Sequence, residues 1–426
     1  MSTDKKEYDV FKGLLNGSQK NTLSAESVLE VIRSQAQERL GKESRVYVLH
    51  DGSDLRKPNA QDMAYLGKVM SLQKQVITGY KTLNSVAVDI TGKDITLIDH
   101  TLYSTGMPNY VSKETLSLIG LIGLIGQHSP KVPNLAPVMW DNIEKGEYLN
   151  NTTVYFQALL NSHNTIKRGN LDIKITHIQD REFDGEEYFE YADDLKDEFI
   201  TRLKLSRLSN LTRPVYTPKG KLSKKLAYVK LIDKAFEHQF SYDIQRISIK
   251  NKTYVNVKCT IEWEKLILNN RTYSVVRITL RDEKGKPIFQ QPMMLITNRV
   301  LECAQDARQV YQAYLLRFKI EVVFRFLKTN LGWETFQVRD FQSIKNLVAL
   351  AFFLVGYFKE LADDIQNHEI YSLIAQIGGG KGIVSIHFLL IGLEKLVHFQ
   401  QIQQLIDNHA LTKDDIQHAI NQFAFS

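Results

Sequence analysis

The chain has 426 residues, enough for more than one domain and a large buried core. Hydrophobic residues make up 43% of it and charged residues 24%, a composition that excludes an intrinsically disordered protein. The net charge of +6 is unevenly placed, because residues 202–286 hold 20 Lys and Arg against 7 Asp and Glu. This local excess indicates a segment that binds nucleic acid.

Cysteine content and apolar stretches exclude further classes. Cys259 and Cys303 lack metal-ligand spacing, so neither a zinc module nor a disulfide framework is expected, and a reducing cytoplasm is the predicted location. The N-terminus has no apolar signal region. The apolar runs at 116–126 and 347–357 fall short of the roughly 20 residues of a membrane span, so no membrane association is predicted.

Three aspartates on or near the first predicted strands are candidates for the first functional acid. A helical leader is expected over 1–45, with Ser24 as a capping signal, serving either DNA binding or packing. The β-branched run 45–50 predicts a buried strand that ends at Asp51, before Gly-Ser, which would present this carboxylate at a sheet edge. A turn aspartate is the alternative. Asp54 and Asp89 are the other candidates for this acid. Asp89 is the weaker one, because it ends a later strand than the one that Asp51 ends.

The middle of the chain predicts a second acid at the end of a strand. Residues 105–165 are expected to be largely helical, and the strand 174–179 ends at Asp180. A helix over 185–195 and a strand over 198–204 should follow, the latter carrying Arg202 and Lys204. Residues 205–290 then read as a basic, all-β unit with an exposed loop at 207–225.

A long helix is predicted from Tyr311 to Glu334, where apolar residues recur every three or four positions. One side of it would hold Leu316, Ile320, Val323 and Leu327. On the opposite side, a phenol, two cations and one acid form a single stripe: Tyr314, Arg317, Glu321 and Lys328. An ordinary charged helix surface is the alternative interpretation. Residues 341–426 are predicted to be helical, with a break at 378–380.

The spacing Tyr-x2-Arg-x3-Glu-x6-Lys resembles the Tyr-Arg-Glu-Lys (YREK) signature of bacterial insertion-sequence transposases with an Asp-Asp-Glu (DDE) active site. The resemblance implies that Asp51, Asp180 and Glu321 are catalytic and together hold Mg²⁺ or Mn²⁺, two ions per site. It also implies a set of DNA contacts: Tyr314, Arg317, Lys328, Arg202, Lys204, Met293 and Phe318. Family members carry Trp at the positions of Met293 and Phe318, which leaves a hairpin step in excision open.

The fold expected from this resemblance is mixed α/β: an RNase H-like mixed sheet with flanking helices. Its core would comprise 46–204 and 291–340, interrupted by the β-rich insertion 205–290, with the helical region 341–426 packing or pairing two subunits. The implied function is cut-and-paste DNA transposition by a homodimer acting on terminal inverted repeats and target DNA, in the cytoplasm and on the nucleoid. A nuclease without strand transfer and a catalytically silent, end-binding repressor are the alternatives.

Overall fold

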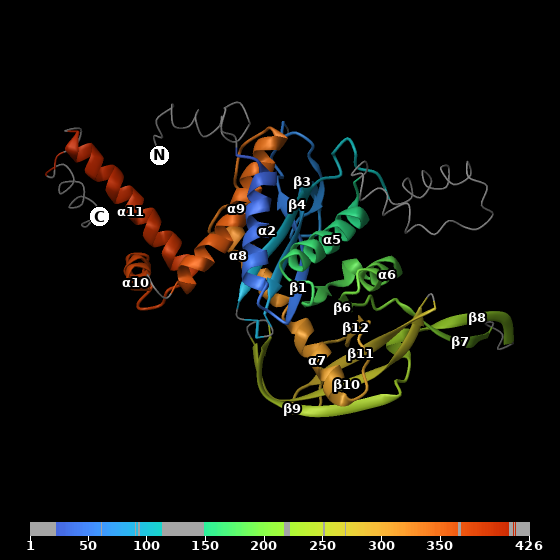
Figure 1. Cartoon of the computed structure of the whole chain (residues 1–426). Helices are drawn as coiled ribbons and strands as arrows, with labels where there is room; N and C mark the ends of the chain where they lie inside the picture. The colour runs from blue at the N-terminus through green and yellow to red at the C-terminus, as the bar shows by residue number, and fades with distance from the viewer. Residues whose placement is uncertain are drawn as a thin grey trace. The chain divides into compact units, whose positions relative to one another are not determined.

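The computed structural model describes residues 23–60, 62–89, 91–92, 94–112, 149–216, 222–249, 252–268, 270–364, 368–408, 412 and 414. The chain divides into two compact units (Figure 1). The first comprises Met1–Phe324 and Glu334–Ala349, and the second comprises Arg325–Trp333 and Leu350–Ser426. Parts of the predicted helical stretch 105–165 and of the exposed loop 207–225, and the end of the tail, lie outside the described residues.

The centre of the first unit is one large mixed sheet. Its strand order is β2-β3-β1-β5-β6-β12-β11-β10-β9, and β4 also pairs with β3. The pairs β1–β5 and β5–β6 are parallel and the other pairs antiparallel. This arrangement confirms the predicted mixed α/β fold and is consistent with an RNase H-like core. The strands are β1 (Arg45–Arg56), β2 (Gly67–Met70), β3 (Val76–Val88), β4 (Ile95–Tyr103), β5 (Lys174–Gln179), β6 (Glu198–Arg202), β9 (His238–Ile249), β10 (Lys252–Leu268), β11 (Arg271–Arg281) and β12 (Met293–Thr297).

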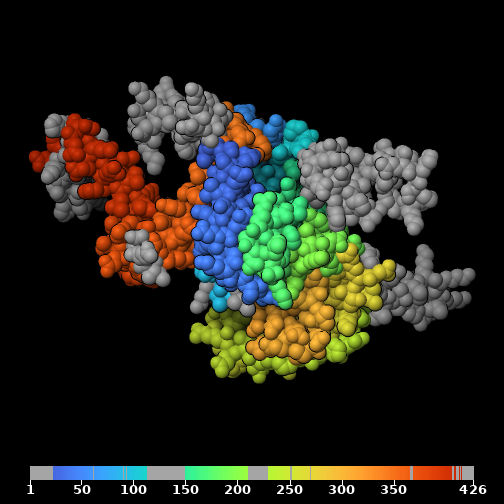
Figure 2. All heavy atoms as spheres, viewed as in Figure 1, coloured from blue at the N-terminus to red at the C-terminus, as the bar shows by residue number. Residues whose placement is uncertain are grey.

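Two helices lie side by side against the β1–β3–β4 part of the sheet (Figures 1 and 2): α2 (Ala25–Leu40) and α5 (Asn151–Gly169). Each begins with a capping box, formed by Ser24 with Ser27 in α2 and by Asn150 with Thr153 in α5. These side chains bond backbone N–H groups that the first turn leaves without partners. Sequence signals therefore fix where both helices begin.

A second part of the core is rich in aromatic rings. Phe156 of α5 packs at 4.9 Å and 85° against Tyr191 of α6 (Glu186–Asp194). Phe189 of α6 stacks at 5.0 Å on Phe199 of β6. Such edge-to-face and offset pairs add to the free energy gained from burying the rings. They hold α6 over the strands that follow Asp180.

The strands predicted as an insertion do not all form a separate unit. A two-stranded sheet of β7 (Leu208–Tyr216) and β8 (Leu222–Lys230) stands apart from the large sheet. By contrast, β9, β10 and β11 extend the large sheet, because β11 pairs with β12. The helix α7 (Ala304–Leu315) packs on β10 and β11. The strands of the predicted core and most strands of the predicted insertion thus share one hydrogen-bonded sheet.

The second unit contains α10 (His368–Ile377) and α11 (Ile386–Asp407), which pack closely. A Cβ atom at Gly392 would lie 1.9 Å from the carbonyl oxygen of Ile374, so only glycine allows this approach. The helix α9 (Phe341–Asp363) is long and apolar enough to cross a membrane. A buried core helix meets the same criteria, and Val348 and Phe352 of α9 are fully buried.

The aromatic packing predicts a large stability effect for one core residue. Phe156→Ala should lower the free energy of unfolding by about 3–5 kcal/mol, because it removes a fully buried ring and leaves a cavity. Leu171→Ala is the matched control, since this side chain is 79% exposed and should change stability by less than about 0.5 kcal/mol. Denaturant unfolding followed by circular dichroism measures both. Equal midpoints for the two variants would contradict the core assignment.

Candidate functional site

Adjacent parallel strands place the first two acids at the same level. His50 of β1 is in register with Gln179 of β5, and Asp51 and Asp180 are the next residues on each strand. The prediction that Asp51 follows the end of its strand is wrong. β1 continues to Arg56, because Asp51 also pairs with Asn84 of β3. Asp180 does follow β5 and leads into a single 3₁₀ turn, η1 (Arg181–Phe183).

The predicted long helix is broken where its signature arginine lies. The structure has α7 ending at Leu315 and a second helix, α8 (Phe318–Thr329), beginning three residues later. Between them, the N–H of Leu316 bonds the carbonyl of Ala313 at 3.0 Å, and the N–H of Arg317 bonds that of Tyr314 at 3.0 Å. These i→i−3 bonds tighten the turn. Tyr314 and Arg317 are buried, and they do not lie on one continuous helix with Glu321 and Lys328 as predicted.

Arg317 joins two of the predicted catalytic acids. Its Nη1 donates to Asp51 Oδ2 at 2.7 Å and its Nη2 donates to Glu321 Oε1 at 2.8 Å. The residue is only 7% exposed. Burial opposes its charge, but Asp51 and the other nearby acids outweigh this and raise the pKa of Arg317. Charge-assisted hydrogen bonds of this length are strong, so Arg317 fixes the spacing of the two carboxylates.

Asp180 is contacted by two other residues that the sequence singled out. The hydroxyl of Tyr314 donates to Asp180 Oδ1 at 3.4 Å, and Arg202 Nη1 lies 4.0 Å from the same oxygen. Burial and the charge of Asp180 raise the pKa of Tyr314, which keeps the phenol protonated and able to donate. The structure thus brings together Asp51, Asp180, Glu321, Tyr314, Arg317 and Arg202.

Asp51 lies among other carboxylates that repel its negative charge, and one of them, Glu182, is a fourth acid at the site. Burial raises the pKa of Asp51 to about 6, against the attraction of Arg317, and the charges of Asp180, Glu182 and Glu321 raise it too. Sequence reasoning missed Glu182. It lies on the η1 turn, accepts a hydrogen bond from the Tyr155 hydroxyl, and sits 3.9 Å from where a Cβ atom at Gly52 would be. Its position two residues after Asp180 was the available signal.

A buried chain of hydrogen bonds underlies the two aspartates, and sequence reasoning missed it as well. Asp197 can only accept, so His177 Nε2 donates to it at 3.0 Å. His177 Nδ1 then accepts from His50 Nε2 at 2.8 Å, and His50 Nδ1 accepts from the Ser85 hydroxyl at 2.8 Å. Burial lowers the pKa of His50, which keeps it neutral. These bonds tie β1 to β5 directly before Asp51 and Asp180.

The competing aspartates have local roles in the backbone. Asp89 Oδ2 accepts from the N–H and hydroxyl of Thr91, and its Oδ1 accepts from the N–H of Asp94. These bonds stabilise the turn between β3 and β4. Asp54 accepts from the N–H of Met70 at 3.2 Å, which joins β1 to β2. Neither bond involves the cluster around Arg317.

The remaining predicted DNA contacts lie at element ends. Lys204 follows β6, and its N–H bonds Asp184 Oδ2 at 2.6 Å. Met293 is the first residue of β12 and pairs with Ile278. Phe318 begins α8 with its side chain 47% exposed, and the Arg317 guanidinium lies 5.2 Å from the centre of its ring. Lys328 lies in the last turn of α8, within the second unit.

Some of the positive charge at 202–286 is neutralised within the protein. Arg207 pairs with Asp184 at 2.5 Å and Arg277 pairs with Glu262 at 2.5 Å. Lys234 pairs with Glu264 at 2.5 Å. The net count of basic residues therefore overstates the number of cations that a nucleic acid could meet on these strands.

The donor chemistry of the cluster suits a hard divalent cation, which prefers carboxylate oxygens. In the part of the chain that the structure describes, however, no three His, Cys, Asp or Glu residues converge as a metal-binding group. Arg317 occupies an oxygen of Asp51 and one of Glu321. Burial raises the pKa of Asp51 and the charges of the neighbouring acids raise it further, so a cation bound among these acids would offset their repulsion. The residues fit such an ion once Arg317 gives up these contacts.

The chain was compared with known protein families. Residues 154–355 match the model of a family described as the transposase DDE domain. The match includes Asp180, Tyr314, Arg317 and Glu321, and Asp51 lies before it. No curated protein matches the chain. The family match supports a DDE transposase, and such enzymes generally use a divalent metal.

The raised pKa of Asp51 predicts a pH dependence of stability. The folded protein holds this proton more tightly than the unfolded chain, whose carboxyl has an ordinary pKa of 3.8. The resulting stabilisation is complete below pH 3.8 and is lost as the pH rises through about 6. Asp51→Asn stays neutral, so this variant should lose less stability between pH 4 and 7 than the wild type.

Denaturant unfolding across this pH range measures the difference, with the exposed Asp172→Asn as the control. Parallel stability–pH curves for Asp51→Asn and the wild type would show that Asp51 titrates normally.

Proposed function

We propose that this protein is a cut-and-paste DNA transposase of the YREK-signature type. The observation that carries the proposal is the cluster of Asp51, Asp180 and Glu321, joined through Arg317 and Tyr314. Asp51 lies on β1, Asp180 directly after β5 and Glu321 on α8, more than a hundred positions apart in sequence. Arg317 bonds Asp51 and Glu321, and Tyr314 bonds Asp180. The family match over 154–355 supports the same conclusion.

Asp51, Asp180 and Glu321 would hold Mg²⁺ or Mn²⁺, two ions per site. Such ions activate an attacking oxygen and stabilise a leaving one during phosphodiester cleavage and strand transfer. The chain's own part is to position the DNA. Arg202 and Tyr314, which now face Asp180, would donate to phosphate oxygens, and Arg317 would turn from Asp51 and Glu321 to a phosphate. Substrate binding thereby frees the carboxylate oxygens.

Pairing of two subunits on DNA is part of the proposal. α10 and α11 present large apolar side chains to solvent, including Ile370, Leu373, Val397 and Phe399. Exposed apolar side chains of this size are characteristic of surfaces that bind a partner. They support a homodimer that holds both terminal inverted repeats and the target DNA, acting in the cytoplasm on the nucleoid.

The central test is metal-dependent cleavage. Asp51→Asn, Asp180→Asn and Glu321→Gln should each reduce Mg²⁺-dependent cleavage by more than the roughly 10–100-fold that loss of an outer-shell partner costs. DNA binding should persist, since each change removes a metal ligand. Asp89→Asn is the control, because Asp89 stabilises a local turn. The substrate is a duplex carrying inverted repeats from the DNA that flanks the gene, and products are resolved on sequencing gels.

The products also separate the proposal from its alternatives. Joining of the cut ends to a second DNA is expected of a transposase. Cleavage without joining would indicate a nuclease, and binding without cleavage would indicate a repressor. Full cleavage by Asp51→Asn would contradict the assignment of the first acid.

Residue 293 allows a test of the excision route. A hairpin intermediate needs a base to leave the stack, which costs a few kcal/mol. Contact between the unstacked base and a methionine side chain offsets about 0.3–1.5 kcal/mol of this cost. Stacking of the base on an aromatic ring offsets more, roughly 1–3 kcal/mol. Met293→Ala should therefore have a mild effect, and Met293→Trp should be neutral or activating. Denaturing gels show hairpins as products of doubled length. Normal nicking without hairpins in Met293→Ala would reveal a larger role for Met293.

A further inference from the structure

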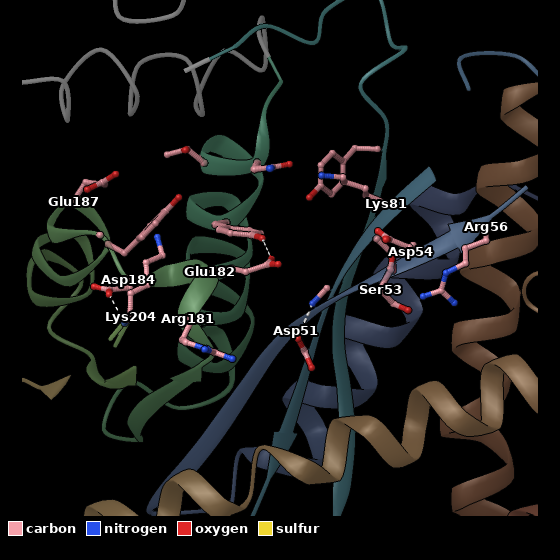
Figure 3. Close-up of a pocket in the computed structure, with 18 residues that line it drawn as sticks. Asp51, Ser53, Asp54, Arg56, Lys81, Arg181, Glu182, Asp184, Glu187 and Lys204 are labelled. Atoms are coloured by element: carbon pink, nitrogen blue, oxygen red, sulfur yellow. Dashed lines mark hydrogen bonds between the residues drawn. The ribbon is translucent and has the colours of Figure 1, made fainter. Parts of the chain in front are cut away.

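A cavity of about 830 Å³ opens beside Asp51 (Figure 3). Its walls come from β1, β3, the last residue of β4, the start of α5, the η1 turn, the start of α6 and the residue Lys204 after β6. No lining residue belongs to α7, α8 or the strands β9–β12, all of which the structure describes. Tyr314, Phe318 and Met293 therefore do not line the cavity.

Three cations without counter-ions stand around this cavity. Lys81 lies on the β3 side, and Arg181 and Lys204 lie on the opposite side, with Glu182 between them (Figure 3). Within the described ranges, none of these three side chains forms an ion pair or a hydrogen bond. Arg56, the fourth cation of the lining, does pair with Glu334 at 3.4 Å.

Most carboxylates of the lining already have donors. Asp51 is held by Arg317 and Asp184 is held by Arg207. Glu182 accepts from the Tyr155 hydroxyl. The lining also includes Asp54 and Glu187, and Lys81, Arg181 and Lys204 are the cations that can offer charge to a bound anion. The rest of the lining includes neutral hydrogen-bonding side chains, Ser53, Thr82, Asn151 and Thr152. Lysine, arginine, hydroxyl and amide groups are the ones that proteins place on the phosphates of nucleic acids.

The size of the cavity suits a short stretch of one strand. A volume of about 830 Å³ is in the range of small-molecule binding sites, about 300–1,000 Å³. One or two nucleotides of a single strand fit such a space. Because Asp51 lies at its edge, a strand in the cavity continues directly from a phosphate held at the catalytic acids.

We propose that this cavity binds the sugar-phosphate backbone of a single DNA strand, on the side of the cut phosphodiester away from α7 and α8. The inference rests on the proposed transposase function, since the cut phosphate is what Asp51 would act on. Lys81 and Arg181 contact successive phosphates from opposite walls, with Lys204 beside Arg181. The cavity thus binds a DNA strand that is unpaired next to the cut.

The test compares two DNA probes with the full-length protein, in the absence of divalent cations so that no cleavage occurs. One probe is a blunt 30-base-pair duplex, and the other is the same duplex with a four-nucleotide single-stranded overhang. Affinity is measured by fluorescence anisotropy over a range of salt concentrations. Each phosphate contact made on the single strand steepens the dependence of log affinity on log salt by about 0.7.

The overhang should bind with the steeper slope, and the double variant Lys81→Ala, Arg181→Ala should lower that slope by about 1.4 while leaving the blunt duplex unchanged. Lys174→Ala is the matched control, because Lys174 is exposed at the opposite end of β5 from Asp180. If the blunt duplex binds but the overhang adds nothing, or the double variant weakens both probes alike, the inference is overturned and the proposed function stands. If neither probe binds, the proposed function fails as well.

Discussion

The ion pairs of Arg317 with Asp51 and Glu321 are the constraint on which the arrangement of the acids depends. Like charges would otherwise separate, and the charges of Asp180 and Glu321 add to the effect of burial in raising the pKa of Asp51. A guanidinium suits this position because its planar fork donates to two carboxylates at once and stays charged when buried. The tightened turn between α7 and α8 exists at the residue that makes these contacts.

The rest of the site follows from the sheet. Parallel pairing of β1 with β5 sets Asp51 and Asp180 side by side, and the buried chain from Ser85 to Asp197 holds that register. The strand β12 leads the chain from the sheet into α7, and so to Arg317 and Glu321. The three segments that carry the acids are therefore connected to one hydrogen-bonded sheet, rather than to a flexible loop.

Much of this could be predicted from the sequence where local chemistry decides. Capping residues gave the start of α2, and a run of apolar and β-branched residues gave β5, with Asp180 directly after it. The break at Arg317 could not be predicted, because helical periodicity continues through it and only a distant partner, Asp51, opposes it. Glu182 and the histidine chain were missed because their contacts also join residues that are distant in sequence. The joining of β11 to β12 was also missed, since strand pairing depends on neighbours far apart in sequence.

The order in which these segments are synthesised determines when the cluster of acids can be completed. Chains are synthesised from the N-terminus at roughly 5–20 residues per second, so Asp51 and Asp180 emerge well before Glu321. The strand β6 can pair with β12 only after the whole stretch that includes β7–β11 has been made. Closing such a long-range contact is slow compared with forming local hairpins such as β9–β10. The nascent chain therefore holds an incomplete set of acids through most of its synthesis, and the cluster is completed only when α7 and α8 fold onto the sheet.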